Sequence, residues 1–342
     1  MLIGVWNYHE SLHKDNYMLS EFTEDCLGED SMRPFYEFFL DAKSKGHNVE
    51  ILNDKRDIDE YDIFIFINFP KRNKKIVNQA LNTNKPKYLI NQECPIIYPE
   101  TWLNKNYTLF EKVFTWADDI IDNKIFFKIN CPSYGPDKVR DFPKIEKSKF
   151  CVTIISNKYN NHLNDLYWKR LEILKWFEKN HLNDLDFYGY GWNNYVFKGP
   201  RIIRVLNKLT FLTKILAPKY KNYKGEYIGK KNDLLKHYKF SICIENAKFY
   251  PGYITEKIFH CFFSLTVPIY LGSDNVQEHI PKECFIDLRD FKNYEELYKY
   301  LKLMKQDRYE EYQMKIKKFL KSEKFNQFSI KYYIETLTKN IF

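Results

Sequence analysis

The chain has 342 residues, of which 44% are apolar and 18% aromatic, so it can bury the core of one large domain or two smaller ones. Its 54 Lys and Arg exceed its 45 Asp and Glu and give a formal net charge of +9. The 11 Gly and 13 Pro exclude a collagen-like or low-complexity protein, and no apolar run approaches the roughly 20 residues that a bilayer-spanning helix needs.

The first part of the chain alternates strand-like and helix-like patterns. Short β-rich runs that predict strands lie over 2–6, 48–52, 62–68 and 87–91. Amphipathic stretches over 33–45 and 71–81 predict helices. Because buried strands that alternate with helices favour a parallel sheet covered on both faces, we expect residues 1–148 to form one α/β domain.

The same pattern restarts after a loop-rich stretch over 132–143. Further strands are predicted over 150–156, 184–189, 238–245, 267–271 and 285–288, and further helices over 165–179 and 255–263. We therefore expect an α/β fold of two doubly wound, Rossmann-like domains that face each other across a cleft, with 149–300 as the second domain and ligands at the carboxyl ends of the strands. The remaining helical patterns, over 301–342, are expected to pack back on the first domain.

Residues 198–239 carry more net positive charge than the whole chain. They include 12 Lys and Arg and 2 acids, a local charge of +10 against +9 for the molecule. Their first half, 201–216, alternates bases with Ile, Val, Leu and Phe at helical spacing, which is typical of helices that bind membrane surfaces. The alternatives are a surface helix packed on its own domain and a nucleic-acid-binding surface.

The first ten residues lack the basic and apolar regions of an export signal. We therefore expect a cytoplasmic protein. The basic segment leads us to expect that this protein binds peripherally to an anionic membrane surface, on the inner face of the membrane, and that nucleic acid is not a partner.

The most informative stretch begins with a buried strand that ends at Glu245 and Asn246. A Pro-Gly turn follows, and then Thr255 stands where a side chain can cap a helix, with Glu256 and Lys257 in the first helical turn. Because a helix N-terminus and a lysine both favour anions, this pattern suits a diphosphate, and Glu256 can accept hydrogen bonds from ribose hydroxyls. An ordinary capped helix with a solvated Glu–Lys pair is the alternative for these residues in isolation.

The whole window from 238 to 272 is similar to the donor-site motifs of the α-1,3/1,4-fucosyltransferases. It contains, in the order of that family, Y-K-F-S-I-C-I-E-N, a turn with aromatic residues and glycine, Y-I-T-E-K-I, and F-S-L-T-V-P-I-Y-L-G. The resemblance implies a GT-B architecture, an inverting glycosyltransferase, and a C-terminal domain that holds GDP-fucose.

The resemblance also implies roles for individual residues. Glu93, in N-Q-E-C-P, falls where relatives carry an acceptor-activating carboxylate, so it is the expected base. Arg170, or its neighbour Lys169, and Lys257 are expected to neutralise the departing diphosphate. The other positions that match donor-binding residues of the family are Asn246, Tyr253, Thr255 and Glu256.

Two acid pairs, Asp57 with Asp59 and Asp184 with Asp186, have the D-x-D spacing of metal-dependent transferases. Such pairs are more often solvated carboxylates, and two cationic side chains in the site make a metal unnecessary. We expect no metal, a GDP-sugar donor and an oligosaccharide acceptor.

The function expected from the resemblance is transfer of L-fucose from GDP-fucose to an acceptor glycan, as α-1,3-fucosylation of lipopolysaccharide or a surface oligosaccharide. One alternative is transfer of another GDP-activated deoxysugar. A second is a non-catalytic module that binds glycan or nucleic acid.

Overall fold

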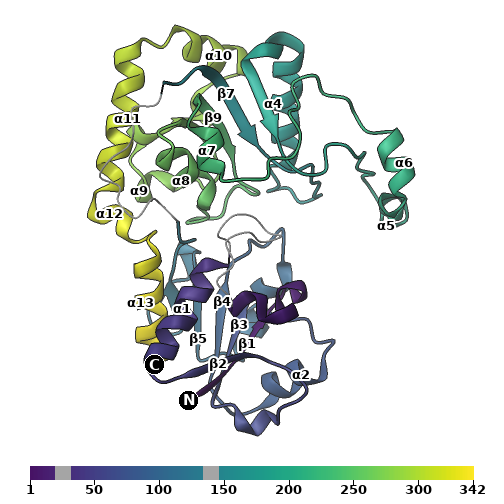
Figure 1. The fold of residues 1–342 in the computed structure, drawn as a ribbon, viewed down its shortest axis with the longest axis vertical. Helices are drawn as coiled ribbons and strands as arrows, with labels where there is room; N and C mark the ends of the chain where they lie inside the picture. The colour runs from purple at the N-terminus through teal and green to yellow at the C-terminus, as the bar shows by residue number, and fades with distance from the viewer. Residues whose placement is uncertain (20–31, 134–145) are drawn as a thin grey trace. The chain divides into compact units, whose positions relative to one another are not determined.

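The computed structural model describes residues 1–19, 32–133 and 146–342, which Figure 1 shows as a ribbon. Contacts within the chain divide it into two units. Unit 1 consists of Met1–Tyr134, Pro251–Tyr253 and Asn326–Phe342, and unit 2 consists of Gly135–Tyr250 and Ile254–Phe325. The C-terminal helices are therefore divided between the units. The loop predicted over 132–143 falls almost entirely outside the described residues.

Unit 1 is built on a parallel sheet with the strand order β2-β1-β3-β4-β5-β6. Its strands are β1 (Leu2–Asn7), β2 (Asn48–Ile51), β3 (Ile63–Ile67), β4 (Lys87–Asn91), β5 (Lys112–Thr115) and β6 (Phe126–Lys128). Its helices are α1 (Arg33–Ser44), α2 (Lys75–Asn82), α3 (Asn104–Tyr107) and α13 (Ile330–Ile341), with 3-10 turns η1 (Glu10–Leu19), η2 (Ile58–Glu60), η3 (Pro99–Trp102) and η4 (Asp118–Ile120). The first four strands lie within one residue of their predicted ranges, whereas β5 and β6 were not predicted.

Alternation along β3 divides the apolar side chains of unit 1 between two cores. Ile63, Ile65 and Ile67 point to the face covered by α1 and α13, and Phe64 and Phe66 point to the face covered by α2. Because both faces are buried, β3 is continuously apolar, as central strands of parallel sheets are.

The last helix, α13, belongs to the core of unit 1. Its N-terminus is capped by Ser329, whose hydroxyl accepts a hydrogen bond from the Tyr332 N–H at 3.1 Å. Leu337 is buried against α1, and Thr338 donates a hydrogen bond to the Asp41 carboxylate at 2.7 Å. These contacts join the end of the chain to the helix that follows β1.

Unit 2 is built on a second parallel sheet, with the order β11-β10-β9-β7-β8. Its strands are β7 (Lys149–Ile154), β8 (Leu185–Tyr188), β9 (Tyr238–Ile244), β10 (Val267–Leu271) and β11 (Ile286–Asp287). Its helices are α4 (Tyr167–Asn180), α5 (Arg201–Arg204), α6 (Thr210–Ile215), α7 (Lys231–Leu235), α8 (Glu256–Phe263), α9 (Val276–His279), α10 (Tyr294–Leu303) and α11 (Gln306–Leu320). Helix α12 (Glu323–Asn326) leads into unit 1. The 3-10 turns of unit 2 are η5 (Leu182–Asp184), η6 (Val205–Lys208), η7 (Lys282–Cys284) and η8 (Leu288–Asp290). All five strands lie within two residues of their predicted ranges.

The two faces of β9 have different neighbours. Phe240, Ile242 and Ile244 pack in the core formed with α4, α10 and the first half of α11. Cys243 and the next residue on that alternate face, Glu245, lie toward α8, where their side chains interact with Cys261 and Lys257 respectively. The residue that follows the strand therefore places its carboxylate in the interior beside α8.

The predicted fold class, doubly wound α/β with parallel sheets, is confirmed in each unit. One predicted helix differs: over 201–216, α5 runs directly into η6, and the non-helical backbone of Leu209 separates η6 from α6. None of the described helices combines the length and the apolar character needed to cross a bilayer.

Candidate active site

In each sheet the strand order reverses between two neighbouring strands, β1 and β3 in unit 1 and β7 and β9 in unit 2. Open α/β sheets bind ligands in the crevice outside the carboxyl ends of the strands at such a point. In unit 2 the side chains of Arg170 and Asn246 meet there. In unit 1 the residue after β1, Tyr8, meets Glu93 there. The sequence-predicted residues thus fall into two groups, one on each sheet.

The unit 2 group is organised by the carboxylate of Glu245, which is fully buried. This carboxylate accepts hydrogen bonds from the Thr255 N–H at 2.9 Å, from the Thr255 hydroxyl at 2.9 and 3.0 Å, and from Lys257 Nζ at 3.0 Å. Lys257 Nζ also donates to the Thr255 hydroxyl at 2.8 Å. Because a buried charge is destabilising by several kcal/mol unless it is paired and hydrogen-bonded, these contacts fix the end of β9 to the start of α8.

Gly272 leaves room for the side chain of Glu245 because it has no Cβ atom. A Cβ atom added to Gly272, which follows β10, would lie 2.6 Å from Glu245 Cγ and 2.4 Å from the hydroxyl of Tyr270. Any larger residue at this position would displace the buried carboxylate. The final glycine of the motif is therefore required because the Glu245 side chain approaches its backbone closely.

Thr255 occupies the N-cap position of α8, as the sequence predicts, but it does not cap in the expected way. In the described part of the chain its side chain makes no hydrogen bond to the first N–H groups of the helix. Its hydroxyl is oriented toward Glu245 instead. The helix N-terminus therefore lies beside the buried acid without the usual threonine cap, and its dipole favours an anion.

Charge at the start of α8 is set by several neighbours. Burial alone would lower the pKa of Lys257, but the carboxylates of Glu245 and Glu256 outweigh it and hold that pKa above its usual range. Burial would raise the pKa of Glu256, but the positive charges of Lys257 and Lys231 lower it to about 2. Both side chains are therefore ionised at neutral pH.

Arg170 brings a second cation to the end of β9. Its side chain is 5% exposed, and Nη2 donates to the carbonyl of Ile244 at 2.6 Å and to the side chain of Asn246 at 3.0 Å. Lys169, the alternative, instead forms an ion pair at 3.1 Å with Glu172 on the same helix. Of these two cations, the structure places Arg170 beside Asn246.

The first turn of α4 is fixed to the segment after β9, which explains the position of Arg170. The Leu166 N–H donates to the Asn246 carbonyl at 3.1 Å, and the Asp165 carboxylate accepts from the Tyr167 N–H at 2.7 Å. Asp165 and Ala247 also form an isolated bridge. Arg170, in the first turn of α4, is therefore held at the carboxyl end of β9.

Glu93 lies in unit 1, just after β4. Its backbone N–H donates to the side chain of Asn68 at 3.0 Å, and its carboxylate accepts from the Tyr8 hydroxyl at 2.9 Å. Burial, together with the charge of Glu93, raises the pKa of Tyr8 well above its ordinary value, so Tyr8 stays protonated and donates. The Glu93 carboxylate is thereby held at the switch point of its own sheet.

Tyr253 is grouped with unit 1, unlike the residues on either side of its short segment. Its ring centroid lies 4.8 Å from that of Trp116, and the ring of Trp116 lies 4.9 Å from that of Trp102, whose Nε1 donates to the Glu93 carbonyl at 2.9 Å. Gly252, at φ +82°, permits this turn because an added Cβ would lie 2.2 Å from the carbonyl oxygen of Trp116.

Three of the four acids in the two D-x-D pairs make local structural contacts. The Asp57 side chain caps η2, and Asp184 accepts from the Tyr298 hydroxyl at 2.6 Å and from Lys302 at 2.9 Å. Asp186 accepts from the Tyr238 hydroxyl at 2.7 Å. Within residues 1–19, 32–133 and 146–342, no cluster of three or more His, Cys, Asp or Glu is arranged to hold a metal ion.

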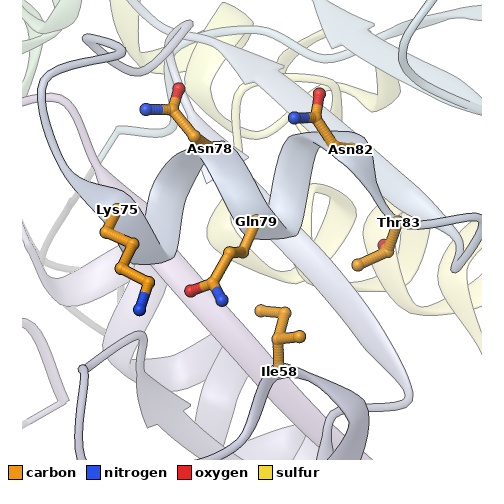
Figure 2. Close-up of a pocket in the computed structure, with 6 residues that line it drawn as sticks. All are labelled: Ile58, Lys75, Asn78, Gln79, Asn82 and Thr83. Atoms are coloured by element: carbon orange, nitrogen blue, oxygen red, sulfur yellow. The ribbon is translucent and has the colours of Figure 1, made fainter.

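Figure 2 shows a shallow pocket along α2, lined by Ile58, Lys75, Asn78, Gln79, Asn82 and Thr83. Because η2 precedes β3 and α2 runs back toward the start of β4, this pocket lies on the flank of the sheet and not at the carboxyl ends of its strands. It contains none of the predicted site residues, so we do not place the chemistry there.

Sequence reasoning missed the role of Glu245. The sequence places this residue at the end of a buried strand but gives it no function, whereas the structure makes it the partner of both Thr255 and Lys257. A signal was present: if an acid that directly follows a strand of apolar residues is buried, its charge must be paired and hydrogen-bonded.

The Glu245 contacts predict a large loss of stability on replacement. Glu245→Gln is expected to lower the free energy of unfolding by about 2–3 kcal/mol, below the loss for a fully buried pair because the Lys257 side chain is 26% exposed. Denaturant titration measures this loss. The matched control is Glu295→Gln, which breaks an exposed pair with Lys299 and should cost at most about 0.5 kcal/mol. Equal losses for the two variants would show that Glu245 does not anchor the site.

Comparison with known proteins places the unit 2 group in a family. Residues 144–333 match the model described as glycosyltransferase family 10 (fucosyltransferase) C-terminal domain. The chain is 42% identical over 84 residues to the alpha-(1,3)-fucosyltransferase FucT of Helicobacter pylori, which covers 25% of this chain and 17% of that protein. It is 41% identical over 73 residues to an alpha-(1,4)-fucosyltransferase of Arabidopsis thaliana, 21% of this chain and 18% of that one. These matches span less than a quarter of the curated relatives.

Solved structures extend the likeness to the fold. An alpha1,3-fucosyltransferase with GDP matches with a TM-score of 0.55 at 16% identity, over 99% of this chain and 89% of that one. An alpha-glucosyltransferase in complex with UDP and DNA matches with a TM-score of 0.57 at 12% identity, over 100% and 99% of the two chains. Both are GT-B glycosyltransferases, built like this chain on two parallel sheets with helices. Since the family model matches more than half of its residues, the chain belongs to glycosyltransferase family 10, the fucosyltransferases.

Proposed function

We propose that the chain is an inverting glycosyltransferase that moves L-fucose from GDP-fucose to a hydroxyl group of an acceptor glycan. The observation that carries this proposal is the meeting of Arg170, Asn246 and Lys257 at the end of β9, beside the N-terminus of α8. These residues lie within the part of the chain that matches the family model. A structural neighbour described as an alpha1,3-fucosyltransferase with GDP-fucose supports the choice of donor.

The donor diphosphate would lie over the N-terminus of α8. Arg170 and Lys257 are both charged at neutral pH, and charge-assisted hydrogen bonds of this kind contribute roughly 1.5–3 kcal/mol each. The helix dipole adds to their attraction for an anion. Glu256 is ionised and 40% exposed, so it can accept hydrogen bonds from the ribose hydroxyls. Asn246, Tyr253 and Thr255 complete the donor-binding set.

The chemistry requires a base for the acceptor and cations for the leaving group. The acceptor oxygen forms a bond to the anomeric carbon while the bond from that carbon to the β-phosphate oxygen breaks, and the electron pair leaves with GDP. The proton of the acceptor hydroxyl passes to Glu93, and Arg170 and Lys257 stabilise the charge that develops on the diphosphate. One displacement inverts the anomeric centre and gives an α-fucoside. Because two side-chain cations supply the positive charge, the reaction needs no metal ion.

The acceptor is proposed to be a lipopolysaccharide or another surface oligosaccharide, modified with an α-1,3 linkage. The Helicobacter pylori relative is an alpha-(1,3)-fucosyltransferase, which supports the linkage. In unit 1 the rings of Tyr8 and Tyr98 lie 4.8 Å apart beside the Glu93 carboxylate. Such rings offer an apolar surface on which the carbon face of a sugar can pack.

The donor site predicts a thermal response to GDP. GDP at about 100-fold its Kd should raise the melting temperature by roughly 5–10 °C, because a ligand that binds only the folded state stabilises it. Lys257→Ala should remove most of this shift, since it removes one of the two cations. Thermal unfolding with and without GDP measures both effects.

Lys169→Ala is the matched control for that experiment, because Lys169 is the cation next to Arg170 and pairs with Glu172 on α4. It should keep the full GDP shift. UDP in place of GDP should give a smaller shift, and GDP-fucose should be hydrolysed faster than GDP-mannose. The absence of any GDP shift in the wild-type chain would refute the donor site.

The proposed base makes a separate prediction. Glu93→Gln should lower kcat for transfer to N-acetyllactosamine at least about 100-fold and leave the GDP melting shift unchanged, because a positioned base contributes roughly 10²–10⁴-fold. The assay follows radiolabelled fucose from GDP-fucose to the acceptor. Glu100→Gln, which neutralises an exposed acid on η3, is the control and should transfer normally. Near-normal transfer by Glu93→Gln would mean that another group accepts the proton.

The metal-free mechanism is tested with a chelator. Excess EDTA should leave the wild-type rate of transfer within about twofold, because Arg170 and Lys257 neutralise the leaving group without an ion. A loss of transfer that added Mg²⁺ or Mn²⁺ restores would contradict this part of the mechanism.

A further inference from the structure

The segment between β8 and α7 protrudes from the rest of unit 2. It carries α5, η6 and α6, and Figure 1 shows α5 and α6 set apart from the β7–β9 sheet. We define residues 198–225 as the basic arm. In sequence it holds eight Lys or Arg and no Asp or Glu. No residue of the arm belongs to the donor or acceptor groups described above.

Polar contacts tie the basic arm to unit 2. The side chain of Asn207 exchanges two hydrogen bonds with the backbone of Phe197, at 2.8 and 3.0 Å. Thr213, which is buried, accepts at its carbonyl from the Tyr195 N–H at 2.7 Å and donates from its hydroxyl to Asn194 at 3.2 Å. These contacts hold α5, η6 and α6 through polar groups, whereas Tyr220 and Tyr223, near the C-terminal end of the arm, pack on Phe187 in the core of unit 2.

Most apolar side chains of α5, η6 and α6 are exposed, whereas an ordinary surface helix buries its apolar face. Ile202 is 86% exposed, Phe211 78% and Ile215 63%, and Val205 and Leu209 are each more than half exposed. An amphipathic helix that packs on its own domain would bury this set. The apolar surface of the arm is therefore available to a partner.

The four cations of α5, η6 and α6 are also available. In the described part of the chain, Arg201, Arg204, Lys208 and Lys214 form no ion pair, and all four are exposed. Exposed apolar groups thus alternate with unneutralised positive charges along α5, η6 and α6.

We propose that the basic arm docks the protein on an anionic phospholipid surface. Ile202, Phe211 and Ile215 insert into the boundary between the head groups and the acyl chains, and Arg201, Arg204, Lys208 and Lys214 contact the lipid phosphates. This proposal does not depend on which sugar the enzyme transfers.

The pattern fits a membrane better than other partners. Nucleic-acid surfaces combine cations with aromatic stacking and polar contacts, whereas the exposed apolar groups of this arm are mostly Ile, Leu and Val, which find no partner on a phosphate backbone. The centres of protein interfaces are depleted in charged residues, whereas here bases alternate with the apolar side chains. The lipid head-group region accepts apolar side chains and basic side chains together.

Vesicle sedimentation tests the proposal. The full chain should bind vesicles of phosphatidylcholine mixed with phosphatidylglycerol, bind pure phosphatidylcholine vesicles far more weakly, and lose affinity as salt rises. The variant R201Q/R204Q/K208Q/K214Q should bind the anionic vesicles about 10²–10³-fold more weakly, because each Lys or Arg near an anionic leaflet is worth about 1 kcal/mol. The variant I202S/F211S/I215S should lose at least about tenfold, most clearly at high salt where only insertion remains.

The matched controls alter exposed residues elsewhere on unit 2. The variant K305Q/K318Q/K321Q removes surface charge, and L303S/M314S removes side chains that are 80% and 60% exposed. Both should bind vesicles as the wild-type chain does. All four variants should keep the wild-type melting temperature, and the comparison of anionic with neutral vesicles on the wild-type chain needs no variant at all.

Three outcomes would overturn the proposal. The first is equal or undetectable binding of the wild-type chain to anionic and neutral vesicles. The second is tight, salt-sensitive binding to duplex DNA that the serine variant retains, with vesicle binding unchanged in that variant; this result would assign the arm to nucleic acid. The third is a wild-type dimer that becomes monomeric in the serine variant and does not bind vesicles, which would make the arm a contact between copies.

Discussion

The unit 2 site depends on one buried carboxylate. Glu245 directly follows β9, a strand that is buried on both faces, and Thr255 and Lys257 stabilise its buried carboxylate. In satisfying Glu245, these two residues bring the first turn of α8 to the end of β9. The space that Gly272 leaves permits the arrangement. The cation that we assign to the donor is therefore positioned by the requirement to neutralise an interior acid.

The two groups of site residues follow a rule of the doubly wound fold. In each sheet the first strand has neighbours on both sides, and helices cover opposite faces, α1 and α2 in unit 1 and α4 and α8 in unit 2. Such an arrangement leaves a crevice at the carboxyl ends of the strands. Arg170 and Asn246 lie at this point in unit 2, and Tyr8 and Glu93 at this point in unit 1. The proposed mechanism divides its parts in the same way, with the leaving-group cations on one sheet and the base on the other.

The basic arm obeys a different constraint from the rest of unit 2. In the core of that unit, between β9 and α4, apolar side chains are buried against the sheet. In α5, η6 and α6, polar residues such as Asn207 and Thr213 make the attachments, and most apolar side chains are exposed. A segment built this way gains little from its own domain and is stabilised most by a surface that accepts both apolar groups and positive charge.

The sequence by itself determined the parallel α/β class, the limits of nine strands to within two residues, and the motif at 238–272, because these follow from local hydrophobic periodicity and from residue order. It also placed Thr255 at a helix start. Only the tertiary structure decided that the Thr255 hydroxyl turns to Glu245, that Arg170 and not Lys169 lies beside Asn246, and that the apolar side chains of 201–216 are exposed. Each of these depends on contacts between residues distant in sequence or on which side of a helix faces a sheet, and local patterns do not encode such contacts.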